Sequence, residues 1–128
     1  MKVHNRIPPR QYTVGFGPGV TINDCGDIHL RADEQITLKT ENDGEYDVTR
    51  KLWGFYATPS INGRLARFKL NTALVRNRLN QFFILLVEEG NENHFNLYVR
   101  EEGLTLCGWL DDDTLPRVER ALTLSDMP

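Results

Sequence analysis

The residue types best suited to bind a ligand lie together in the middle of the chain, between Lys51 and Arg64. Three aromatic side chains in this stretch offer flat apolar surface, on which sugars and bases stack. Hydroxyl and amide groups follow them, and a lysine and an arginine flank them with positive charge. This mixture is typical of a site for an anionic molecule that carries a ring. The predicted ligand-binding residues are Lys51, Trp53, Tyr56, Thr58, Ser60, Asn62, Arg64 and Arg67. The alternative is that the aromatic residues, Trp53, Phe55 and Tyr56, belong to the core, where such side chains usually lie.

The distribution of charge singles out the same part of the chain. Residues 48–87 contain seven lysine or arginine residues and no acid, whereas residues 88–128 carry a net charge of -7. One interpretation is structural: the basic block packs beside the acidic end, and each exposed ion pair stabilises the fold by about 0–1 kcal/mol. The other is that the block presents a positive surface to an anion, because arginine pairs well with phosphate and carboxylate. The whole chain has a net charge of -3, which argues against a nucleic-acid partner.

Three segments resemble a small bacterial family of unassigned function. They are the run Trp-Gly-Phe-Tyr-Ala-Thr-Pro-Ser-Ile-Asn-Gly-Arg-Leu at 53–65, Ile-Pro-Pro-Arg at 7–10 and Trp-Leu-Asp at 109–111. Members of that family are encoded among genes for surface polysaccharide and unusual sugars, and the resemblance covers most of the chain. It implies carbohydrate biosynthesis as the context, and neither a reaction nor catalytic residues. In that context, we expect the anionic ligand to be a sugar nucleotide or a phosphosugar.

Residues with the chemistry of metal ligands or catalysts are sparse. Asp24, Cys25 and His29 are the weak candidates for a metal site, because ligands of these types bind zinc or iron. Gly26 predicts a turn that interrupts their alternation, and the sequence predicts neither a metal nor a cofactor. The acidic run at 111–113 is better explained as the start of a helix. The sequence therefore favours a binding module over an enzyme. A small sugar-modifying enzyme that uses the three candidates is one alternative.

The predicted fold class is α+β, a mainly antiparallel sheet of hairpins with two short C-terminal helices packed on one face. Asp-Gly at 43–44 predicts a tight hairpin turn, because both residues tolerate positive φ angles. The apolar run Phe82–Val87 lacks alternation, so we expect a central strand with both faces covered. The predicted elements are strands at 27–30, 35–39, 46–53, 66–76, 81–87 and 104–110, and helices at 91–102 and after 111–114.

The length of 128 residues predicts one domain, 1–128, with residues 1–20 as an irregular extended arm and 125–128 frayed. No apolar run approaches the roughly 20 residues of a membrane span, and no secretory signal is visible. We therefore expect a cytoplasmic protein without a membrane partner, in which Cys25 and Cys107 are reduced core thiols; the alternative is a single disulfide between them. A further alternative function is protein interaction: the basic block would dock on an acidic partner protein, or on the acidic end of a second copy in a homodimer.

Overall fold

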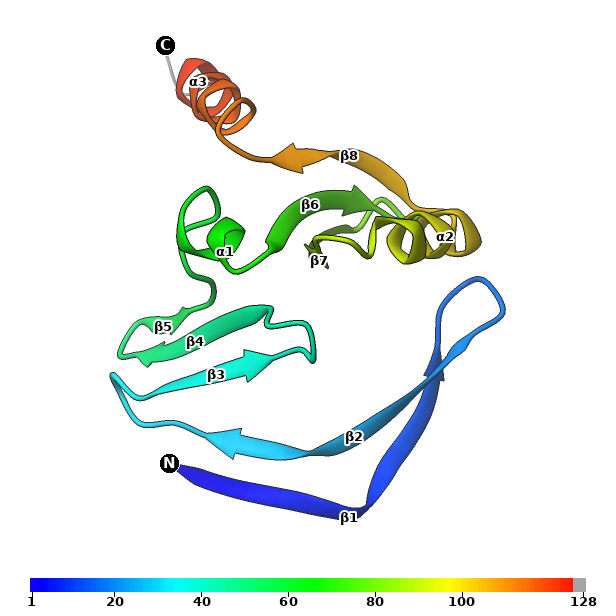
Figure 1. Cartoon of the computed structure of the whole chain (residues 1–128), viewed down its shortest axis with the longest axis vertical. Helices are drawn as coiled ribbons and strands as arrows, with labels where there is room; N and C mark the ends of the chain where they lie inside the picture. Colours follow the sequence, from blue (N-terminus) through cyan, green and yellow to red (C-terminus); the bar gives the residue numbers. More distant parts are fainter. Residues whose placement is uncertain (126–128) are drawn as a thin grey trace.

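Three antiparallel sheets and three short helices form residues 1–125, the part of the chain that this computed structural model describes (Figure 1). The first sheet has two strands and the others have three each, in the orders β3-β4-β5 and β7-β6-β8. The α+β class predicted from the sequence is confirmed. The elements are β1 (Lys2–Val14), β2 (Val20–His29), β3 (Gln35–Lys39), β4 (Glu45–Lys51), β5 (Gly54–Tyr56), α1 (Arg64–Arg67), β6 (Leu70–Arg76), β7 (Phe82–Glu88), α2 (Glu92–Glu102), β8 (Thr105–Leu110) and α3 (Leu115–Ser125).

The N-terminal residues form a long hairpin, so the prediction of an irregular arm over residues 1–20 was wrong for most of that span. β1 pairs with β2 over almost its whole length, and the register shifts between Asn5 and Arg10. Two prolines occupy the shift, where a missing N–H does not interrupt the ladder. The hairpin bends there and crosses the molecule as a separate layer (Figure 1). The extended backbone predicted around the prolines is therefore confirmed, whereas its pairing with β2 was not predicted.

The tip of this hairpin is attached to the end of α2 by a buried carboxylate. Glu102 accepts hydrogen bonds from the backbone N–H groups of Phe16, at 2.6 Å, and Gly17, at 3.3 Å. A two-stranded hairpin alone is marginally stable in water. The contact with Glu102 therefore ties the tip to the better-packed half of the molecule.

The second sheet has one polar and one mainly apolar face. Its hairpin connection spans residues 40–44, which include the predicted Asp43 and Gly44, and Asp43 there has a positive φ of 70°. The register places Gln35 opposite Thr49 and Ile36 opposite Val48. Because side chains alternate between faces, the polar residues of both strands share one side of the sheet. That side carries the candidate site described below.

The third sheet and α2 enclose the main core. Phe95 of α2 is buried among Ala73, Val75 and Val87, with Val99, Leu85, Leu104 and Trp109 packed at the edges. The helix ends at Gly103, as predicted, and this residue has the left-handed φ of 64° typical of a helix C-cap. Asn91 precedes the helix, but its side chain makes no capping hydrogen bond.

The position of β7 corrects the prediction of a central strand. β6 lies between β7 and β8, so β7 is at the edge of the sheet. Its first residues are largely exposed, at 61% for Phe82, 44% for Phe83 and 48% for Ile84. An apolar run indicates that both faces of a strand are covered by other groups. It does not indicate whether those groups belong to the same chain or to another one.

The two cysteines are free and exposed, so the prediction of core thiols was wrong, and they do not pair with each other. Cys107 lies at a β-bulge: Leu106 and Gly108 pair with consecutive residues of β6, which leaves Cys107 unpaired between them. The following turn agrees with the prediction of a helix start. The Asp111 carboxylate accepts hydrogen bonds from the N–H groups of Asp113 and Thr114. The predicted fraying at 125–128 concerns residues that, after Ser125, lie outside the described range.

Candidate functional site

A pocket of about 210 Å³ opens on the polar face of the second sheet. Three of the predicted ligand-binding residues, Lys51, Tyr56 and Arg64, meet there. They come from the end of β4, the end of β5 and the start of α1. The remaining residues around the pocket are Gln35, Asp47, Thr49 and Pro59.

Local geometry explains why these side chains converge. Asp47, Thr49 and Lys51 are two residues apart on β4, so they point to the same face. Tyr56 lies directly opposite Thr49 in the β4–β5 ladder, which places both side chains on that face. The loop after β5 then folds back, because the backbone N–H of Arg64 donates a 2.8 Å hydrogen bond to the Ser60 hydroxyl. This contact positions the start of α1 at the rim of the pocket.

An ion pair between a buried carboxylate and a partly exposed arginine lines the pocket. Asp47 is 5% exposed, accepts a 2.8 Å hydrogen bond from the Thr37 hydroxyl and pairs with the guanidinium of Arg64. The Arg64 side chain is 42% exposed, so part of its fork faces the solvent. Lys51 pairs at the rim with Asp33, a largely exposed residue outside the pocket. The pocket lining thus holds two cations and one carboxylate, and Asp33 at the rim supplies a second carboxylate, which pairs with Lys51.

An aromatic depression adjoins the pocket. It has a volume of about 380 Å³ and follows the loop from Trp53 to Ile61. Trp53, Phe55 and Tyr56 are 69%, 56% and 55% exposed, so the alternative in which they form the core is wrong. Tyr56 and Pro59 line both hollows. The stacking surface is therefore continuous with the pocket that Lys51 and Arg64 line.

The other predicted site residues have different positions. Thr58 and Ser60 line the aromatic depression, although the Ser60 hydroxyl is engaged by the backbone of Arg64. Asn62 donates a 2.9 Å hydrogen bond to Asp112, in the turn before α3, and lies outside both hollows. Arg67 ends α1 and lines neither of them. The residues missed from the sequence, Gln35, Asp47, Thr49 and Pro59, include the polar members of an alternating pattern that was visible in both strands.

A more apolar cavity lies elsewhere, under the tip of the long hairpin. It has a volume of about 340 Å³ and is bordered by residues of β1, β2, β6, β7 and α2, including Val14, Phe83 and Tyr98. No lysine or arginine lines it, and its one carboxylate, Glu102, already binds the hairpin backbone. This cavity therefore does not provide the charge that an anion requires.

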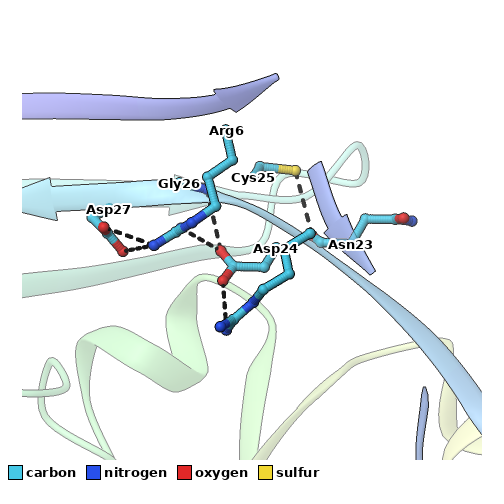
Figure 2. A network of polar contacts seen from close by, with 7 residues as sticks. Arg6, Asn23, Asp24, Cys25, Gly26 and Asp27 are labelled. Atoms are coloured by element: carbon cyan, nitrogen blue, oxygen red, sulfur yellow. Dashed lines mark hydrogen bonds and ion pairs between the residues drawn. The ribbon is translucent and has the colours of Figure 1, made fainter. Parts of the chain in front are cut away.

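The weak metal candidates lie on β2 and are occupied by other contacts. Figure 2 shows Arg6 between Asp24 and Asp27, with guanidinium–carboxylate distances of 2.8 Å to each. The hydrogen bond from Arg6 lowers the pKa of Asp27 below its ordinary value. The Cys25 thiol donates to the carbonyl of Asn23, and the His29 ring meets the ring of His4 edge-on. Within residues 1–125, no three histidine, cysteine or acidic residues are grouped to hold a metal ion.

Comparison with protein-family models, with curated proteins and with solved structures finds no match for this chain. The similarity to a polysaccharide-associated family therefore stays a prediction from the sequence. None of the helices within residues 1–125 combines the length and the apolar character needed to cross a membrane.

Proposed function

We propose that the protein is a cytoplasmic binding module for a phosphosugar or a sugar nucleotide in bacterial carbohydrate biosynthesis. The observation that carries the proposal is the continuity, through Tyr56, of the exposed aromatic surface with the pocket that Lys51 and Arg64 line. A phosphate would meet Lys51 and the free part of the Arg64 guanidinium, and the sugar or base would stack on Tyr56 and Trp53.

Exposure and charge both favour this assignment. Large exposed aromatic side chains are expensive to keep in water, and a group of them beside a polar site is typical of binding surfaces. Arg64 is held rigidly by Asp47, so little conformational entropy is lost when the remaining N–H groups bind an anion. The pocket alone is smaller than a usual ligand site of about 300–1,000 Å³. It therefore suits the phosphate, while the adjoining depression takes the ring.

A binding measurement with one matched pair of variants tests the proposal. Isothermal titration calorimetry would compare glucose 1-phosphate, a uridine diphosphate sugar, inorganic phosphate and neutral glucose as probes. Lys51→Gln removes a charge at the pocket, whereas Lys39→Gln removes an equivalent charge from the same face of the sheet, where Lys39 pairs with Glu45. A charged hydrogen bond contributes about 1.5–3 kcal/mol, so Lys51→Gln should weaken binding about 10- to 100-fold.

Lys39→Gln should leave the dissociation constant unchanged, and both variants should unfold close to the wild type, because each removes one exposed ion pair. Binding of the neutral sugar as tightly as the phosphosugar would contradict an anion site. Absence of binding by every phosphate-bearing probe at millimolar concentration, or equal loss in both variants, would refute the proposed function.

A further inference from the structure

The chain exposes more surface than its size requires. Its accessible area is 9576 Å². A folded monomer of 14.7 kDa is expected to expose about 6,900 Å², which leaves an excess of about 2,600 Å². Obligate interfaces remove about 1,000–2,500 Å² from each partner, so the excess has the size of such an interface. The question is which surface of the chain such a partner would cover.

The edge of β7 is the surface least protected against pairing with another strand. Hydrogen bonds from Asn77 to Gln81 and from Glu89 to Lys69 fix which residues of β7 face β6. The alternation of an antiparallel ladder then directs the backbone groups of Phe82, Ile84, Leu86 and Glu88 outward. Within residues 1–125, no strand pairs with this edge.

The other sheet edges carry features that discourage pairing, and β7 does not. Natural proteins protect edges with proline, lysine, charge, bulges or short strands. β1 contains Pro8 and Pro9, and β2 has a shifted register between Asp24 and Gly26. β3 ends in Lys39, β5 has three residues, and the register of β8 is broken by the bulge at Cys107. β7 reads Phe-Phe-Ile-Leu-Leu-Val-Glu, pairs with β6 in regular register and is apolar on both faces.

Charge at the two ends of β7 indicates a second copy of the same chain as the partner. Arg76 and Arg78 lie at the Phe82 end, and Glu88 and Glu89 lie at the other end. None of the four takes part in an ion pair within the described residues. Two antiparallel copies of β7 would bring the arginine end of each beside the glutamate end of the other, twice. A parallel arrangement would place like charges together.

We propose that two copies of the protein pair through β7, antiparallel across a two-fold axis at Ile84, to form one continuous six-stranded sheet. With Ile84 opposite itself, Phe82 faces Leu86 of the other copy, so every pair within 82–86 is apolar with apolar. A register shifted by one ladder step would place Phe82 opposite Glu88. In the proposed dimer β7 becomes a central strand, which is the position that its sequence predicts. None of these residues lines the pocket between Lys51 and Arg64, so the proposed dimer and the proposed ligand site can be tested independently.

Sedimentation equilibrium of the full chain tests the dimer. The wild type should be a dimer at micromolar concentration. Ile84→Lys should raise the dissociation constant by at least about 100-fold, because it buries a charge at the axis. Leu38→Lys is the matched control, since Leu38 lies on the edge strand β3 and both side chains are 48% exposed; this variant should remain a dimer.

Cysteine cross-linking provides the second measurement, which does not depend on how well Ile84→Lys folds. In a background with Cys25→Ser and Cys107→Ser, Ile84→Cys should form a covalent dimer under mild oxidation. Directly hydrogen-bonded antiparallel residues have Cα atoms about 5.5 Å apart, within the range of a disulfide. Leu38→Cys should not cross-link. A wild type that stays monomeric at 100 μM would overturn the proposal. A dimer that Ile84→Cys fails to link, or that Leu38→Lys dissociates as strongly as Ile84→Lys does, would also overturn it.

Discussion

The replacement Arg64→Gln should reveal how much the ion pair beneath the pocket stabilises the fold. The change leaves the carboxylate of Asp47, which is only 5% exposed, without its cation. Breaking a fully buried pair costs about 3–5 kcal/mol, whereas an exposed pair contributes about 0–1 kcal/mol. The guanidinium of Arg64 is 42% exposed, so we expect an intermediate loss of about 2 kcal/mol in the free energy of unfolding. For a chain of this length, that corresponds to a melting temperature lower by about 8 °C.

Urea unfolding at a fixed protein concentration would measure the loss, because association would otherwise change the apparent stability. The double variant Asp47→Asn with Arg64→Gln should recover at least half of it, since no unpaired charge then remains buried. Arg67→Gln is the control on the same short helix, and its effect should stay within about 0.5 kcal/mol. If the single variant unfolds at the wild-type urea concentration, or the double variant is no more stable than the single one, Arg64 does not neutralise Asp47 in the way described. Arg64 both neutralises Asp47 and lines the pocket, so its replacement would change stability and binding together, whereas Lys51→Gln tests binding alone.

Two further predictions concern the long hairpin. Arg6 lowers the pKa of Asp27 below its ordinary value of 3.8, so this pair should stabilise the protein above about pH 3.8 and cease to do so as the pH falls below it. A pH series of urea unfolding should therefore show that Asp27→Asn loses less unfolding free energy in acid than the wild type does. Equal losses would contradict the assignment. Glu102→Ala should lower the free energy of unfolding by about 2 kcal/mol and speed hydrogen exchange at the Phe16 amide, because two backbone donors lose their acceptor. The control Glu101→Ala, at the exposed neighbouring residue, should do neither. Unchanged exchange at Phe16 would show that the hairpin tip is held by other contacts.

Features set by neighbouring residues could be predicted from the sequence. The turn before β4 depends on the positive φ of Asp43, a residue type that tolerates this conformation, and the end of α2 depends in the same way on the positive φ of Gly103. The grouping of Lys51, Tyr56 and Arg64 followed from their closeness along the chain. Their exposure could not be predicted, because it depends on which sheet face other elements leave open.

Features that depend on distant partners were missed. Residues 2–14 contain two prolines and many polar groups, so nothing local identifies them as a strand; the pairing with β2 does. Asp47 looked like one more charge in a polar hairpin, and only the return of the chain at Arg64 buries it. The apolar run of β7 was read correctly as a strand, and its place in the sheet was not. That place depends on what lies beyond its free edge.

The three sheets follow one another along the chain without exchanging strands. Each sheet closes from contacts between residues that are near in sequence, and such local topologies pay little loop-closure entropy and fold quickly. During synthesis, each sheet could therefore form as soon as its last strand leaves the ribosome, in the order in which it is translated. The bond between Glu102 and the hairpin tip spans 86 residues and must form late. The first hairpin should consequently exist as a separate, loosely held layer until α2 is complete.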